Sequence, residues 1–157
     1  MRILIAIENL NLKKGELRRI IHMQYFAWPD KGVPSINVEL INFFEEVSFM
    51  HQQSIDNFNQ KRRKIYEPNP LGCPIREVDE LPICVNCSTG CDNSATFCAI
   101  NICLSYYHSS SVLTRVAKIV EKIRMVRTNA ISSFDQFLFI YDMLKNYDMY
   151  VQSISKK

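Results

Sequence analysis

The sequence predicts a mixed α/β domain, and three observations support that prediction. A short β-branched apolar run stands near the start, at residues 3–7. A compact apolar run at residues 81–85 leads into a turn of small residues and then into an apolar helix. In the last third of the chain, apolar residues recur at spacings of three and four, the period of helices. The length of 157 residues fits a single domain over residues 1–157.

The first two strands are expected to form a hairpin. Ile3–Ile7 is the first strand, and Arg18–Phe26, which alternates loosely, is the second. The polar segment Asn9–Glu16 joins them, with Gly15 in the turn. The second strand ends at Trp28-Pro29-Asp30.

A helix is expected to open at Pro34 and Ser35. Its apolar stripe consists of Leu40, Phe43, Val47 and Met50. Residues 57–80 are polar and interrupted by prolines, so we predict a long loop there.

The second half begins with a buried strand at Leu81–Val85, which a small-residue turn at 86–93 follows. Ser94 then starts an apolar helix that reaches about Tyr107. Two further helices carry the stripes Val112, Val116, Ile119, Val120 and Ile123, and Phe134, Phe137, Leu138, Tyr141 and Leu144.

The composition is that of an ordinary globular protein, with 47% hydrophobic residues and a net charge of +3. The basic run Lys61–Lys64 could contact nucleic acid, but such a run in a loop is more often a solvated surface, so we expect no nucleic-acid partner. No stretch approaches the length of a membrane span, and the start lacks a signal-peptide pattern. We therefore expect a cytoplasmic protein without a membrane partner, whose six cysteines are thiols.

Three cysteines stand at C-x2-C-x3-C spacing, at Cys84, Cys87 and Cys91. That spacing allows a zinc or iron–sulfur interpretation. Cys84 falls in the predicted strand and other cysteines in an apolar helix, where cysteine behaves as a small hydrophobe. The sequence therefore implies no metal and no organic cofactor.

The central turn has the layout of an anion site. A strand, a turn and a helix N-terminus direct backbone N–H groups at one spot, where phosphate binds readily. A cysteine at the start of such a turn, here Cys87, has its thiolate stabilised and can act as a nucleophile. Asp92 contradicts this layout, because a carboxylate repels an anion.

Four stretches carry a resemblance to the classical protein tyrosine phosphatases. CSTG at 87–90 with Ser94 resembles the signature loop HCSAG-x-GR-[ST]-G. HMQYFAWPDKGVPS at 22–35 resembles HFQYTSWPDHGVP, which holds the family's acid loop. TFCAINICL resembles the helix after the signature loop, and IRMVRTNAISSFDQFLFIYDML resembles the closing segment IRRQRPGMVQTEEQYIFIYDAL. The amino-acid sequence of the last two stretches is most similar to that of tyrosine-phosphatase-like proteins of polydnaviruses (bracoviruses).

The resemblance implies the C-terminal portion of the phosphatase fold, with a mixed sheet flanked by helices and a strand–phosphate loop–helix at its centre. It implies that Cys87 attacks phosphotyrosine, that Asp30 of the WPD loop protonates the leaving group, and that Ser94 helps the thiolate leave. The phosphate loop would consist of Cys87, Ser88, Thr89, Gly90, Cys91, Asp92 and Asn93. Gln136 would position the hydrolytic water.

Four departures from the family pattern weaken this chemistry. Asn93 stands where the family has the arginine that grips phosphate with two charged hydrogen bonds. Asp92 replaces a glycine, and Asn86 replaces the histidine before the cysteine. Ser132 replaces the first glutamine of the closing segment. We therefore expect a poor or inactive catalyst, a pseudophosphatase.

Domains of this family are longer, so the chain is interpreted as an N-terminally truncated copy. The first hypothesis is a non-catalytic module that binds host signalling proteins, including phosphotyrosine proteins, in the host cytoplasm and modulates immune signalling. The second is a weakly active tyrosine phosphatase with Cys87 as nucleophile and Asp30 as acid. A third is a decayed reading frame whose product folds badly.

Overall fold

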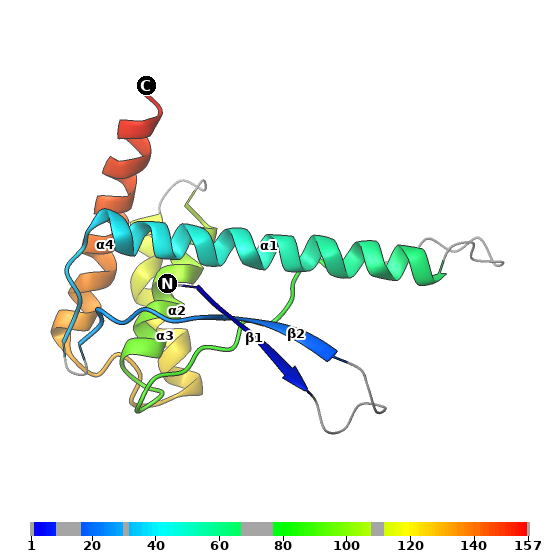
Figure 1. Ribbon diagram of the computed structural model, residues 1–157. Helices are drawn as coiled ribbons and strands as arrows, with labels where there is room; N and C mark the ends of the chain where they lie inside the picture. The colour runs from blue at the N-terminus through cyan, green and yellow to red at the C-terminus, as the bar shows by residue number, and fades with distance from the viewer. Residues whose placement is uncertain (1, 9–16, 30–31, 67–76, 108–111, 157) are drawn as a thin grey trace.

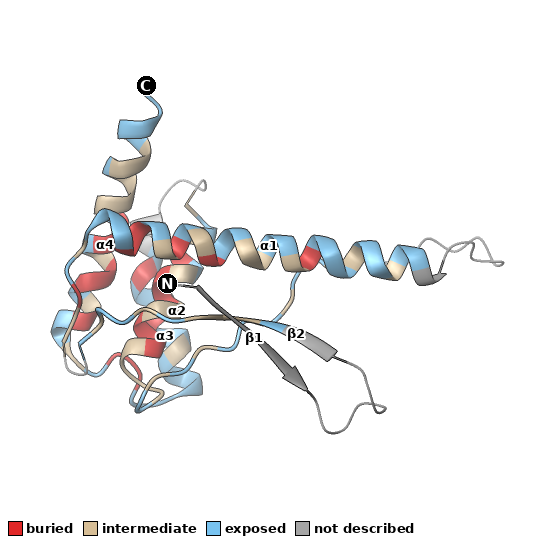
Figure 2. Ribbon diagram, viewed as in Figure 1, coloured by how far each residue is buried: buried red, intermediate tan, exposed pale blue. Residues whose placement is uncertain are grey.

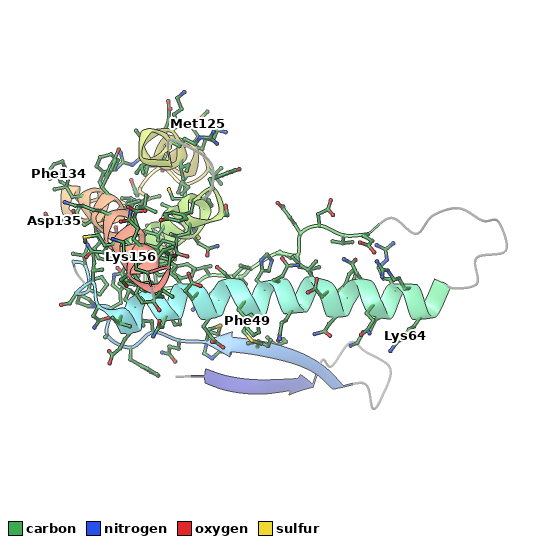
Figure 3. All side chains as sticks on the ribbon, turned by 90° about the horizontal axis from the view of Figure 1, so that it is seen from above. Phe49, Lys64, Met125, Phe134, Asp135 and Lys156 are labelled. Carbon is green, nitrogen blue, oxygen red and sulfur yellow. The ribbon has the colours of Figure 1, made fainter. Side chains whose placement is uncertain are left out.

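A computed structural model describes residues 2–8, 17–29, 32–66, 77–107 and 112–156. The elements follow in the order β1, β2, α1, α2, α3, α4. Three helices gather at one end of the molecule, against the first part of the long helix α1 (Figure 1). The far end of α1, at Lys64, extends well beyond this group (Figure 3).

The predicted hairpin is confirmed, with a second strand that ends at Met23 and not at Phe26. β1 (Arg2–Glu8) pairs antiparallel with β2 (Leu17–Met23), with Ile3 opposite His22 and Ile5 opposite Ile20. The predicted connection over residues 9–16 lies outside the described residues.

The prediction of a mixed sheet is wrong for the part of the chain that the structure describes, where the sheet has only these two strands. The predicted strand at 81–85 is chain without a ladder, and Cys84, which we expected inside it, is exposed. The preceding backbone instead lies along α1. The Asn59 side chain exchanges two 2.9 Å hydrogen bonds with the backbone of Val78, and His51 Nε2 lies 2.6 Å from the Leu81 carbonyl oxygen. Side chains of α1 thus satisfy the backbone groups of Val78 and the carbonyl of Leu81, so these groups need no partner strand.

Helix α1 (Val38–Tyr66) begins later and ends much later than predicted. It begins at Val38 because the Asn37 side chain accepts a 2.9 Å hydrogen bond from the Leu40 N–H, as a helix cap does. It includes residues 57–66, which we predicted to be loop, because the first proline of that stretch comes only at Pro68. The basic run therefore lies near the end of a helix, with Arg63 and Lys64 in its last turn, where positive charge suits the helix dipole.

The three remaining helices agree with the prediction. They are α2 (Asn93–Ser105), α3 (Val112–Val126) and α4 (Phe134–Ile154). A capping box starts α4: Ser133 Oγ accepts from the Gln136 N–H at 3.1 Å, and Gln136 Oε1 accepts from the Ser133 N–H at 3.5 Å. None of the described helices is long and apolar enough to cross a membrane.

One core joins the start of α1 to the three shorter helices (Figure 2). Its largest fully buried side chains are Phe44, Leu40, Ile100, Ile131, Ile140 and Met143. Phe44 stacks on Phe97 of α2 with ring centroids 4.8 Å apart. This packing fixes the N-terminus of α2, and with it the turn that precedes that helix.

Candidate active site

The turn over residues 87–92 leads directly into α2. The Thr96 N–H donates to the Asp92 carbonyl at 2.9 Å, which closes the first turn of the helix. Gly90 has φ +66°, a left-handed conformation that glycine adopts without strain. The turn therefore lies at the N-terminus of a helix, where the dipole favours an anion. Of its backbone N–H groups, that of Gly90 is directed at the Cys87 sulfur and that of Cys91 at Thr89 Oγ1.

The Cys87 sulfur lies at the centre of this turn and is half-buried. It accepts a hydrogen bond from the Gly90 N–H at 3.1 Å and lies 3.2 Å from Ser94 Oγ and 3.8 Å from Thr89 Oγ1. Burial alone would raise the pKa of Cys87, but hydrogen bonds from Ser94, Thr89 and Gly90 outweigh it and lower the pKa to about 6. By contrast, burial raises the pKa of Cys103 to about 11. Cys87 is thus a thiolate at neutral pH. Asn86, which stands at the position of the family's histidine, is exposed and is not among the residues that lower this pKa.

This thiolate predicts a specific pH dependence of alkylation. The rate at which iodoacetamide modifies Cys87 should rise with pH through a midpoint near 6 and level off above pH 7, because only the thiolate reacts. Ser94→Ala should move the midpoint upward, since it removes a hydrogen bond that favours the thiolate. Fragment-ion mass spectra of the peptide that contains Cys87 distinguish its modification from that of the neighbouring Cys84 and Cys91. A midpoint near 8.5, the ordinary value of a free thiol, would contradict the geometry.

The Asp92 carboxylate is tied to the connection between α3 and α4. Its Oδ1 accepts hydrogen bonds from the Ser132 hydroxyl at 2.6 Å and from the Ser132 N–H at 3.4 Å. Its Oδ2 accepts a 3.4 Å hydrogen bond from Thr89 Oγ1. Two departures from the family pattern, 40 residues apart, are therefore partners of each other. From the sequence alone, Asp92 and Ser132 are two separate departures.

Asn93 contacts the segment that leads to the predicted acid loop. Its Nδ2 donates to the Pro29 carbonyl at 3.1 Å, while its Oδ1 is buried without a partner. Trp28 packs edge-on against Phe139 of α4 with ring centroids 5.7 Å apart, which anchors this segment to that helix. The structure thus brings the two predicted loops together across 64 residues of sequence. Asp30 lies outside the described residues, so its role as the acid stays a prediction.

Gln136 is almost fully buried, with 4% of its surface exposed, and its side-chain oxygen belongs to the capping box of α4. Positioning of a hydrolytic water by this residue stays a prediction. Ser132, at the family's other glutamine position, faces Asp92 instead. Within the described residues, no group of three His, Cys, Asp or Glu side chains is arranged to hold a metal ion.

Arg127, just after α3, contacts the turn and was missed by the sequence analysis. Its Nε donates to Cys91 Sγ at 3.1 Å and its Nη2 to the Thr89 carbonyl at 3.4 Å. Its pKa is raised, first by the hydrogen bond to Cys91 and by the charge of that sulfur, and further by the charge of Cys87. The only signal in the sequence was the position of Arg127 in the IRMVR stretch of the closing segment.

The site therefore combines a cysteine thiolate, a hydroxyl beside it and a turn at a helix N-terminus, an arrangement that suits a thiol nucleophile. Comparison with known proteins agrees. Residues 3–146 match the model of the protein-tyrosine phosphatase family, and the chain belongs to that family.

Two relatives illustrate the range of the match. Tyrosine-protein phosphatase non-receptor type 9 of Homo sapiens is 33% identical over 136 residues, which are 87% of this chain and 21% of that protein. Tyrosine phosphatase-like protein J1 of Microplitis demolitor bracovirus is 32% identical over 132 residues, which are 83% of this chain and 39% of that protein. The chain spans well under half of the length of each of these two relatives.

Proposed function

We propose that this chain is a catalytically impaired tyrosine-phosphatase-like protein that acts by binding signalling proteins. The observation that carries the proposal is the use made of Asn93: its amide N–H₂ group is bonded to the Pro29 carbonyl and has no charge to offer a phosphate. No residue of the loop 87–93 has a positively charged side chain, and Asp92 adds a negative one. An arginine that stabilises charge in phosphoryl transfer is worth roughly 10³-fold or more in rate.

The second candidate is a weakly active phosphatase, which the state of Cys87 favours. A nucleophile with a pKa of about 6 is ionised at neutral pH, and Ser94 lies beside it. Phosphate would then be held by backbone N–H groups and the dipole of α2 alone, which are weaker than a charged bidentate contact.

The partners proposed for this chain are proteins of a host cell, including phosphotyrosine proteins, in its cytoplasm. The similarity to bracovirus proteins named as tyrosine phosphatases or as phosphatase-like supports this setting, in which immune signalling would be the process modulated. We propose no nucleic-acid partner for the basic run on α1, in which Arg63 forms an ion pair with Glu77 and Arg62 lies over the Phe58 ring.

Turnover of a phosphotyrosine peptide by the purified chain, beside its Cys87→Ser variant, tests the proposal. Equal background rates are the expected result. A rate for the unmodified chain well above that of the variant would overturn catalytic impairment and support the second candidate. In a separate binding experiment, equal capture of host proteins by the unmodified chain and by Cys87→Ser would show that binding does not need the thiol.

A further inference from the structure

The connection between α3 and α4 contacts the turn over residues 87–92, called the phosphate-type turn below, at several points. Arg127 reaches Cys91 Sγ and the Thr89 carbonyl. The Ile131 N–H donates to the Cys91 carbonyl at 3.0 Å, and Ser132 holds Asp92 through its hydroxyl and its N–H. The part of the turn between Thr89 and Asp92 is thus bound from outside along its whole length.

The contact with Arg127 is close as well as polar. A Cβ placed on Gly90 would lie 3.0 Å from Arg127 Nη2 and 3.5 Å from its Cζ. The guanidinium therefore lies directly against the residue whose N–H points at the Cys87 sulfur. Because the planar guanidinium donates from two of its nitrogens, it fixes both a position and an orientation of the turn.

We propose that Arg127 is a positioning residue that, together with Ser132, holds the turn so that the Gly90 N–H is directed at the Cys87 sulfur. Arg127 acts on the outer side of the turn, through Cys91 and Thr89, and does not take the place of the absent loop arginine as a phosphate ligand. The Asp92–Ser132 pair is the second point of attachment, since it fixes the residue that joins the turn to α2.

The inference concerns the same site as the proposed function but does not depend on turnover. The charged or titratable side chains that the structure places against this turn are Cys87, Cys91, Asp92 and Arg127. A test of Cys87 reactivity can therefore contradict the role of Arg127 while catalytic impairment stands. Measured turnover can likewise contradict catalytic impairment while the role of Arg127 stands.

The test measures the pH midpoint of Cys87 alkylation in Arg127→Gln, Arg127→Lys and Ser132→Ala, with folding verified by thermal unfolding. Loss of the two-point contact should raise the midpoint by roughly half a unit to one unit in Arg127→Gln, which slows alkylation at pH 6 about two- to fivefold. Arg127→Lys should recover less than half of this shift, because an ammonium keeps the charge but not the fork of donors. Ser132→Ala should move the midpoint in the same direction by less.

Arg115→Gln is the matched control, since Arg115 is exposed on α3 and lies over the Tyr106 ring, away from the turn. It should leave the midpoint unchanged. Full recovery in Arg127→Lys would overturn the proposal, because it would show that charge alone is what Arg127 supplies. A folded Arg127→Gln chain with an unchanged midpoint would overturn it too.

Discussion

Restoring the family's residues in the loop, with Asn93→Arg and Asp92→Gly together, should raise turnover of a small aryl phosphate by roughly 10²-fold or more. The arginine would supply two charged hydrogen bonds to the phosphate, and removal of the carboxylate would end its repulsion of the dianion. The thiolate of Cys87, already formed near neutral pH, would then face a bound phosphate. Initial rates with the purified double variant measure the effect.

The single variants and a distant control complete this experiment. Asn93→Arg alone should gain less, because Asp92 would compete as an ion-pair partner of the new guanidinium. Asn57→Arg, an exposed position on α1, adds the same charge far from the turn and should change nothing. A folded double variant without any gain would show that the loop charge is not what limits this site.

Replacing Phe44 by alanine should destabilise the fold by about 3–5 kcal/mol. Phe44 is fully buried and stacks on Phe97, so its ring connects α1 to the helix that starts at the phosphate-type turn. The resulting cavity would lie where α1 and α2 meet, so the geometry around Cys87 should loosen along with global stability. Urea unfolding followed by circular dichroism measures the change in free energy of unfolding.

Phe49→Ala is the matched control for that variant. Phe49 belongs to the same helix but is 55% exposed, and it lies away from the cluster of the three shorter helices (Figure 3). Its loss should change stability by no more than about 0.5 kcal/mol. Equal effects of the two variants would mean that the core does not include the α1–α2 contact as described.

The sequence predicted the elements whose signals are local. The hairpin and the three helices after residue 92 followed from apolar spacing, and the resemblance pointed to the turn around Cys87. The extension of α1 through residues 57–66 was missed because polar composition was taken for a loop, although helix formation tolerates an exposed polar surface. The strand at 81–85 was wrongly predicted because an apolar run does not show whether a partner strand exists beside it.

In the candidate site, too, the sequence predicted the residues of a local motif but not the contacts between distant positions. Cys87, Ser94 and Asn93 could be assigned from the motif, and the structure places Cys87 beside Ser94 and Asn93 against Pro29. The bond between Asp92 and Ser132 could not be predicted, because it joins two positions that each depart from the pattern and meet only in the folded chain. Arg127 was missed for a similar reason, since its partners lie 36 and 38 residues earlier.

The central claim is that this loop holds a thiolate but does not hold a phosphate dianion. Protection of Cys87 from alkylation by inorganic phosphate tests it most directly, because bound phosphate would cover the sulfur. We predict that millimolar phosphate leaves the alkylation rate of Cys87 unchanged in this chain and slows it in the Asn93→Arg, Asp92→Gly double variant. Saturable protection of the unaltered chain at millimolar phosphate would contradict the claim.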